Sequence, residues 1–285
     1  MGQCEFPKPR WAGEPLNGKT ILIYAEQGFG DTLQFSRYLN LLREQGARII
    51  FYCDRELVSL FENFAFLHKV ETKSYQKALT ESFDFHIPLM SLPFYCGTTL
   101  ENIPAQVPYI QADAEKIEHW RKRLEKNDFK VGLVWAGRET HLKNQRRSCG
   151  LDVFAPLADI KGVSFFSLQK GEAAQALSSP PASMRIDDLS AGLNDFSDTA
   201  AAIENLDLVI TVDTAVAHLT GALAKPVWTL IYSPPEWRWM IDGDDSPWYP
   251  SMRLFRQSSS EEWGPVLERV AVSLRELLAE SPEHQ

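Results

Sequence analysis

The segment from Leu206 to Ile231 constrains the fold of this 285-residue chain more than any other part of the sequence. Residues 208–212 are almost entirely apolar and rich in β-branched side chains, which is typical of a strand buried on both faces of a parallel sheet. Small and apolar residues at helical spacing follow over 215–223, and 227–231 predict a second strand. The segment therefore predicts a strand, helix, strand unit of an α/β fold. Asp213 stands where the first strand meets the helix, on the side where open α/β sheets bind ligands.

Polar side chains mark this strand end. Asp213 or Thr214 could accept a hydrogen bond from the free N–H groups at the start of the helix. His218 lies four residues beyond Thr214, so the two share a helix face. Ordinary helix capping and a structural histidine would explain the same residues. A ligand-binding role gains weight only if a second strand end of this kind exists elsewhere.

The N-terminal part of the chain supplies such a second strand end. Residues 20–53 predict a strand, an amphipathic helix and another strand, with Gly28 and Gly30 in the first turn. The two glycines allow the backbone to approach a ligand closely. The third glycine of a dinucleotide fingerprint is absent, because Leu33 stands there, so the pattern disfavours an NAD-dependent oxidoreductase.

Asp31 follows these glycines at the predicted start of the helix. The positive end of a helix dipole favours an ionised carboxylate at this position. If no cation neutralises it, such a carboxylate can act as a general base. An N-terminal capping role explains Asp31 equally well.

A basic loop over residues 138–148 is the one strongly cationic segment in an acidic chain. A solvated loop is the usual explanation, but this loop follows a predicted central strand on the ligand side of its sheet. Arginine suits the binding of phosphate oxygens, which makes Arg147 a candidate. Lys170 and Glu172 belong to another polar strand end, after a strand predicted over 163–168.

The chain is long enough for two domains, which we predict over residues 1–125 and 126–285, with an α/β pattern in each. The last predicted helix is striped with leucine and valine and should pack on a domain surface, for which the N-terminal domain is one candidate. The remaining predicted elements are helices over 57–64, 113–126, 151–157, 198–204 and 267–278, and strands over 68–71, 83–88, 107–110, 130–135, 184–187 and 251–256.

Composition excludes several classes of function. A net charge of −9 argues against non-specific binding to nucleic acid or to an anionic membrane surface. The sequence has neither a signal-peptide pattern nor an apolar run long enough to span a membrane. The cysteines are too widely separated for a zinc cluster or a disulfide framework, so we expect no metal and a reduced, cytoplasmic protein: Cys4, Cys53, Cys96 and Cys149.

Four sequence motifs together resemble a known family. They are Tyr-Ala-Glu-Gln-Gly-Phe-Gly-Asp-Thr-Leu-Gln-Phe at 24–35, Val-Gly-Leu-Val-Trp-Ala-Gly at 131–137, Ser-Leu-Gln-Lys-Gly at 167–171, and the Asp-Thr-Ala-Val-Ala-His segment at 213–218. The chain resembles the ADP-heptose:lipopolysaccharide heptosyltransferases, family 9 of the GT-B glycosyltransferases. It is more similar still to the glycosyltransferase-like module of bacterial tetratricopeptide-repeat proteins. The resemblance runs from Trp11 to about Leu278.

The resemblance implies the GT-B fold, in which two Rossmann-like domains with parallel sheets face each other across a cleft. It implies a metal-independent, inverting transfer of a sugar from a nucleotide-diphosphate donor such as ADP-heptose, with no cofactor. The acceptor, whether glycan, lipid-linked or protein, is left open. Ala215 stands where heptosyltransferases generally carry glycine, and the aromatic residue that follows their basic residue before a proline is absent after Arg147. These departures leave the heptose and a lipid acceptor undecided.

Site residues follow from the same resemblance. Asp31 corresponds to the aspartate proposed as the base for the acceptor hydroxyl, in a cleft loop formed with Gly28 and Gly30. The predicted donor-binding residues are those of the helix start that faces the diphosphate, the basic residue near the phosphates, and the strand end near the nucleotide: Asp213, Thr214, Ala215, His218, Arg147, Lys170 and Glu172.

Two other interpretations stay open. The chain could be a catalytically inactive module of the same fold that binds a nucleotide or a glycan. A sugar-nucleotide epimerase of GT-B type would need additional acid and base carboxylates in the cleft, and the sequence does not assign them. Fold resemblance alone does not decide between these functions.

Overall fold

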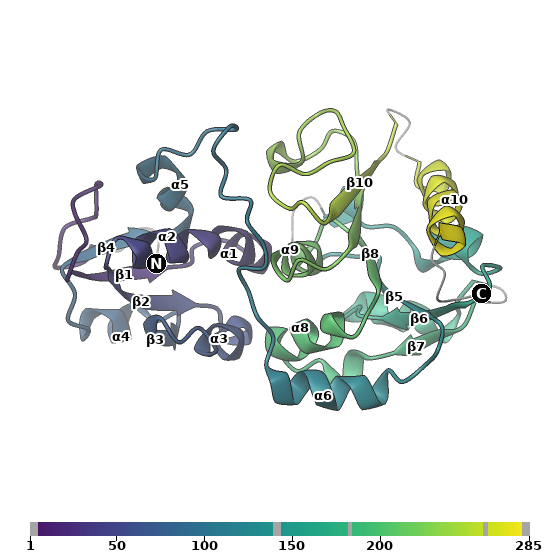
Figure 1. Ribbon diagram of the computed structural model, residues 1–285, viewed down its shortest axis with the longest axis horizontal. Coiled ribbons are helices and arrows are strands. Elements are labelled where there is room, and N and C mark those ends of the chain that lie inside the picture. The colour runs from purple at the N-terminus through teal and green to yellow at the C-terminus, as the bar shows by residue number, and fades with distance from the viewer. Residues whose placement is uncertain (1–4, 139–143, 182–183, 259–261, 281–285) are drawn as a thin grey trace.

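A computed structural model of the chain describes residues 5–138, 144–181, 184–258 and 262–280. These residues form two parallel β-sheets with helices packed around them, one sheet in each half of the chain (Figure 1). The α/β class with parallel sheets, predicted from the sequence, is confirmed.

The N-terminal sheet has the strand order β3-β2-β1-β4, and all its pairings are parallel. The central strands are buried because their residues are apolar on both faces, whereas β3 is a partly exposed edge strand. The strands are β1 Thr20–Tyr24, β2 Arg48–Cys53, β3 Leu67–Thr72 and β4 Phe85–Pro88. The helices of this half are α1 Phe29–Phe35, α2 Arg37–Glu44, α3 Arg55–Glu62, α4 Tyr75–Leu79 and α5 Leu92–Tyr95, with a 3-10 turn η1 at Leu89–Ser91.

The C-terminal sheet has the order β10-β9-β8-β5-β6-β7 and is parallel throughout. Strands β8 and β9 are fully buried, as the apolar runs predicted. The strands are β5 Phe129–Val134, β6 Val163–Ser167, β7 Ile186–Asp188, β8 Leu208–Val212, β9 Val227–Ile231 and β10 Met252–Arg256. The helices are α6 Ala114–Arg123, α7 Asn144–Arg147, α8 Phe196–Glu204, α9 Ala215–Ala222 and α10 Gly264–Glu280, with 3-10 turns η2 Leu151–Leu157, η3 Glu172–Ser178, η4 Ser190–Gly192 and η5 Trp237–Trp239.

Three predicted elements differ from the structure. Residues 107–110 form no strand, because the N–H groups of Tyr109 and Ile110 donate to the carbonyl of Ala222 at the end of α9 (3.0 and 3.3 Å). The predicted helix over 151–157 is the 3-10 turn η2, which contains Pro156 and therefore lacks one helical donor. Helix α10 packs on η2 and β10 of the C-terminal half, where its apolar stripe joins that half's core, and not on the N-terminal domain.

The two halves meet where α1 lies against α9 (Figure 1). Gly30 makes this approach possible, since a Cβ atom at that position would lie 2.9 Å from Cδ2 of His218. Both helices begin directly after the carboxyl end of a strand, β1 in one sheet and β8 in the other. The carboxyl ends of the two sheets therefore face each other across the α1–α9 contact.

A buried arginine reinforces the junction of the halves. Arg37, on α2, is 3% exposed and donates to the carbonyls of Trp248 (2.8 Å) and Pro104 (3.0 Å) and to the hydroxyl of Tyr109 (3.1 Å). Its guanidinium also lies over the rings of Tyr109 and Tyr249. One cation thus joins α2, the segment between the sheets and a loop of the C-terminal half.

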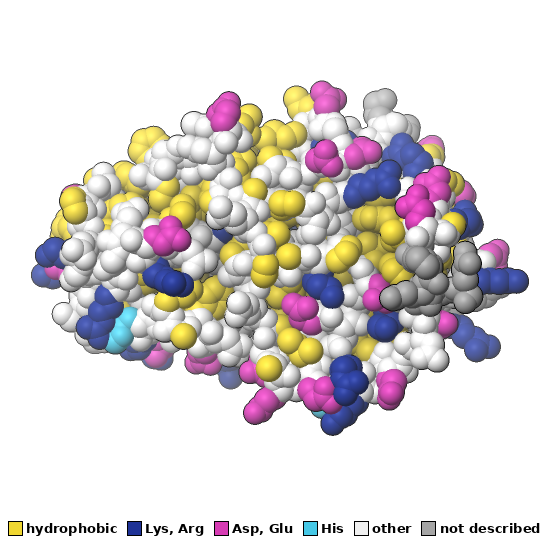
Figure 2. All heavy atoms as spheres, in the orientation of Figure 1, with side chains coloured by type: hydrophobic (Ala, Val, Ile, Leu, Met, Phe, Trp, Pro, Cys, Tyr) yellow, Lys and Arg dark blue, Asp and Glu magenta, His cyan; other side chains and the backbone are white. Residues whose placement is uncertain are grey.

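The surface carries charges of both signs. On the face shown in Figure 2, acidic and basic side chains are interspersed over both halves of the molecule. Among the residues that the structure describes, every helix is too short or too polar to cross a bilayer.

Candidate functional site

The Asp213 strand end forms one side of the site. Asp213 is 4% exposed and directly follows β8, while Thr214 is the N-cap residue of α9. The prediction that a side chain caps this helix is wrong for Thr214, because its hydroxyl pairs with the hydroxyl of Thr211 at 3.0 Å and makes no cap hydrogen bond. The N–H groups at the start of α9 thus lack the side-chain acceptor that an N-cap threonine usually provides.

Two guanidinium groups lie near Asp213. Burial raises the pKa of the Asp213 carboxyl, and the positive charges of Arg238 and Arg147 oppose that rise. The Nε atoms of both arginines are buried and have no hydrogen-bond acceptor among the described residues. Buried donors without an acceptor are rare in folded proteins and suit an anionic ligand.

His218 is a buried, neutral member of this cluster. It is 2% exposed, and its pKa lies well below the usual value because of burial and, after that, the charges of Arg238 and Arg37. Its Nδ1 atom hydrogen-bonds the hydroxyl of Tyr249 (2.9 Å), and its ring stacks on Trp239. These contacts fix the ring but do not by themselves assign it a ligand.

Asp31 faces this cluster from the N-terminal half. Its Oδ2 atom accepts a hydrogen bond from the N–H of Gly28 (3.1 Å), so Asp31 does act at the start of α1. Its Oδ1 atom lies 2.6 Å from a terminal nitrogen of Arg238, and the two side chains are only 22% and 13% exposed. Arg238 reaches this carboxylate from the other half of the chain, so the condition for a general base, a carboxylate free of cations, is not met in this structure. The role of Asp31 as the base stays a prediction.

The other predicted site residues do not all lie close to Asp213. Arg147 lies over the backbone of Gly137, where a Cβ atom would come within 2.5 Å of its guanidinium, and its charge acts on Asp213 and His218. Lys170 is exposed and donates to the carbonyl of Ser190 (2.9 Å). Glu172 is also exposed, at the start of η3. Ala215 is partly buried in the first turn of α9, and residues 139–143 of the basic loop lie outside the described residues.

Sequence reasoning missed Arg37, Arg238 and Glu26. Arg238 belongs to an aromatic stretch after β9, whose position at a carboxyl strand end was the available signal. Glu26 follows β1; its Oε2 atom is buried without a donor among the described residues, and burial, with a smaller effect of the Asp31 charge, raises its pKa. The N-terminal side of the site therefore presents carboxyl oxygens, and the C-terminal side presents N–H donors.

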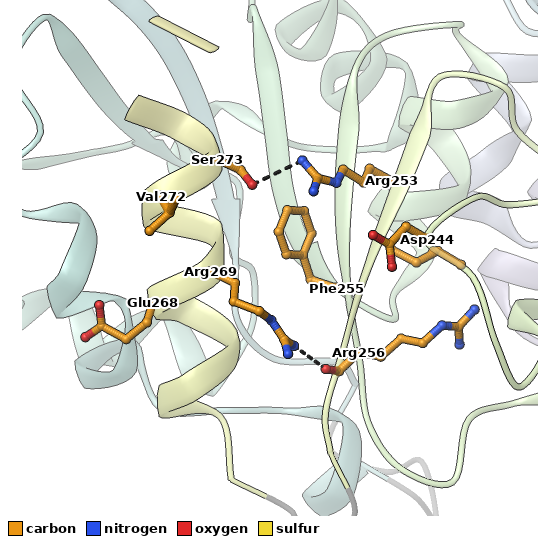
Figure 3. A pocket seen from close by; sticks show the side chains of 9 residues that line it. Asp244, Arg253, Phe255, Arg256, Glu268, Arg269, Val272 and Ser273 are labelled. Carbon is orange, nitrogen blue, oxygen red and sulfur yellow. Dashed lines mark hydrogen bonds between the residues drawn. The ribbon is translucent and has the colours of Figure 1, made fainter. Parts of the chain in front are cut away.

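A groove between α10 and β10 is a separate feature (Figure 3). Within it Arg253 donates to the hydroxyl of Ser273 (3.1 Å), and Arg269 donates to the carbonyl of Arg256. The guanidinium of Arg256 is already bonded to carbonyls of residues 239–243. None of the predicted site residues lines this groove.

The chain is similar to known proteins in sequence and in fold. Residues 161–262 match the model of glycosyltransferase family 9 (heptosyltransferase). This match lies within the C-terminal half of the chain. Its fold is similar to a glycosyltransferase family 9 structure from Veillonella parvula, with a TM-score of 0.70 and 14% identity, over 95% of this chain and 100% of that one. It is also similar to ADP-heptose lipopolysaccharide heptosyltransferase II of Escherichia coli, with a TM-score of 0.66 and 15% identity, over 92% and 99% of the two chains.

A longer curated protein is also similar to this chain. Protein FlbA of Caulobacter vibrioides is 28% identical over 96% of the chain and 49% of its own length, so the chain spans about half of that relative. The family match and the shared fold support a glycosyltransferase. The GT-B fold inferred from the sequence motifs is confirmed. Among the described residues, no group of three or more His, Cys, Asp or Glu side chains is placed to hold a metal ion.

Proposed function

We propose that the chain is an inverting, metal-independent glycosyltransferase that moves a sugar from a nucleotide-diphosphate donor to a hydroxylated acceptor. The division at residue 125 would then separate an acceptor side, in residues 1–125, from a donor side in residues 126–285. One observation carries the proposal. The Nε atoms of Arg147 and Arg238 are buried near the start of α9, and neither has a hydrogen-bond acceptor among the described residues.

These groups suit a diphosphate. Backbone N–H groups at a helix start bind anions, and the helix dipole adds to the attraction. Arginine N–H groups form charge-assisted bonds to phosphate oxygens. When the bond between sugar and diphosphate breaks, negative charge builds on the leaving oxygens, and the same donors would stabilise it. In this proposal the guanidinium groups of Arg147 and Arg238 take the role that a metal ion has in other transferases.

The opposite side suits a hydroxyl group. Asp31 projects from the first turn of α1 toward the C-terminal half, and its carboxylate would accept the acceptor proton. Attack from the N-terminal side, with the donor held on the C-terminal side, is the geometry of an inverting displacement. The E. coli proteins of similar fold are described with ADP and ADP-heptose, which makes adenine nucleotides the first donors to test.

A thermal-shift screen tests the donor site. The purified chain is heated with ADP, GDP, UDP, CDP and their sugars, with and without magnesium. A nucleotide at about 100 times its dissociation constant adds roughly 2.7 kcal/mol of stability. In a chain of this size that corresponds to a rise in Tm of about 5–10 °C. We expect one nucleotide to produce such a rise without magnesium.

The matched variants are Arg147→Ala and Arg146→Ala. Both remove an arginine from α7, but Arg146 is exposed. We expect the first to abolish most of the nucleotide-dependent rise in Tm and the second to retain it. A chain whose Tm responds to no nucleotide would refute the donor site.

A binding module without transfer activity is the second candidate. The ion pair between Arg238 and Asp31 favours it, since it occupies an oxygen of the proposed base. A radiolabelled donor identified by the thermal screen separates the two functions. Release or transfer of the sugar, lost in Asp31→Asn, supports the enzyme, whereas tight binding without turnover supports the module.

A further inference from the structure

Arg238 touches both sides of the site. It belongs to η5, on the C-terminal side, and its guanidinium lies 2.6 Å from Asp31 on the N-terminal side. Of the neighbouring charges, that of Arg238 has the largest effect on the pKa values of both Asp213 and His218. A single cation therefore stands between the proposed base and the start of α9.

The contacts of the Arg238 guanidinium leave at least one of its N–H donors without an acceptor among the described residues. One terminal nitrogen donates to Asp31, and the plane lies near the ring of Trp237, with 5.3 Å between Cζ and the ring centroid. The Nε atom is buried without an acceptor among the described residues. An anion at the start of α9 would offer oxygens that compete with Asp31 for the same N–H groups.

We propose that Arg238 binds the donor diphosphate and thereby couples donor binding to release of the base. It holds Asp31 in the donor-free chain, and a bound diphosphate draws it away from Oδ1. This inference rests on the proposed function. The ion pair then keeps Asp31 from acting until a donor is present, which limits proton abstraction to the loaded site.

The chemical step balances as follows. The freed Asp31 carboxylate accepts the proton of the acceptor hydroxyl while that oxygen forms a bond to the anomeric carbon of the donor sugar. The bond between this carbon and the diphosphate oxygen breaks, and its electron pair leaves with the nucleoside diphosphate. Arg238 and the N–H groups of α9 stabilise the added negative charge on the leaving group.

A double-mutant cycle on nucleotide affinity tests the coupling. The dissociation constant of the nucleoside diphosphate selected by the thermal screen is measured by calorimetry for the unchanged chain, Asp31→Asn, Arg238→Gln and the double variant. If Asp31 competes with the diphosphate for Arg238, Asp31→Asn tightens binding by about 3- to 10-fold. In the Arg238→Gln background the same change should tighten binding by less than about 2-fold, because only charge repulsion is left to remove.

The outcomes separate the inference from the proposed function. Equal or larger tightening in the Arg238→Gln background means that Asp31 acts only as a nearby charge, and it overturns the coupling while the donor site stands. No binding to the unchanged chain overturns both. Circular dichroism checks the fold of each variant, and Arg238→Met replaces Arg238→Gln in the cycle if the latter does not fold. Methionine also removes the cation, so the same limit of about 2-fold tightening applies in that background.

A control variant checks for remote effects. Asp84 is a carboxylate paired with Lys19 at the amino end of β1, in the same half of the chain as Asp31. Asp84→Asn should leave nucleotide affinity within about 2-fold of the unchanged chain, because its charge is exposed and screened by solvent. Tightening equal to that of Asp31→Asn would show a general charge effect and overturn the coupling.

Discussion

Gly221 offers a test in which two physical effects have opposite signs. It lies inside helix α9, where replacing glycine by alanine ordinarily stabilises a helix by about 1 kcal/mol. In this structure a Cβ atom at Gly221 would lie 2.5 Å from Cδ1 and 2.6 Å from Cγ of Tyr249. Tyr249 is 0% exposed, so its ring has no solvent into which it could move.

The steric cost should exceed the gain in helix propensity. Overpacking a tight core costs about 1–3 kcal/mol, and a contact this short places Gly221→Ala near the upper end. After the propensity gain, the free energy of unfolding should fall by about 2 kcal/mol. Displacement of Tyr249 would also disturb its hydrogen bond to His218. The expected fall in Tm is about 4–8 °C.

Thermal unfolding followed by circular dichroism measures this change. Gly264→Ala is the matched control, because Gly264 begins helix α10 and a Cβ atom there would meet nothing within 4 Å. The control should keep or slightly raise Tm. A Gly221→Ala variant as stable as the unchanged chain would refute the proposed packing of α9 against Tyr249.

Two further predictions concern buried charge. Burial lowers the His218 pKa in the folded state, so the unfolded chain takes up a proton first as the pH falls. The folded state is therefore destabilised below pH about 6.5, by up to about 1.4 kcal/mol per pH unit. Chemical denaturation between pH 7.5 and 5 should show that stability falls less steeply with falling pH in His218→Gln than in the unchanged chain, because His86 and other groups with shifted pKa values remain in both; equal slopes would contradict a buried neutral imidazole. Arg37→Met should lower the free energy of unfolding by about 3 kcal/mol or more, because several carbonyl and hydroxyl acceptors lose their donor in a buried site. Arg43→Met, on the exposed face of the same helix, should change it by less than about 0.5 kcal/mol in the same urea titration, and similar losses in both variants would refute the role assigned to Arg37.

The helices and strands that could be predicted are those that depend on the pattern of their own residues. The runs of buried apolar residues in β1, β8 and β9 appear where expected, because strand burial on both faces leaves a continuous apolar pattern. The helix predicted after β8 is α9, and the one predicted after β1 is divided into α1 and α2. Residues 107–110 were predicted as a strand on the same grounds. Their backbone donors instead bond to the carbonyl of Ala222, a partner that no local pattern reveals.

The candidate site was only partly predictable for the same reason. Asp31 and Asp213 could be found because each follows a strand at a helix start. Arg238 could not be paired with Asp31, since 207 residues separate them and the contact exists only when the two halves meet. The capping interpretation of Thr214 failed because its hydroxyl pairs instead with that of Thr211, three residues earlier in β8, which is a local alternative to capping. The roles of Lys170 and Glu172 at the nucleotide stay predictions.

The hydrogen bond to the carbonyl of Trp248 limits when the junction of the two halves can form during synthesis. This carbonyl accepts a hydrogen bond from Arg37, and 211 residues separate the two in the chain. While a ribosome is still adding the C-terminal sheet, the N-terminal half has already emerged with its arginine but without this acceptor. The completed α2 junction can therefore form only after residue 248 has left the exit tunnel, and until then the guanidinium must remain hydrated or bonded elsewhere.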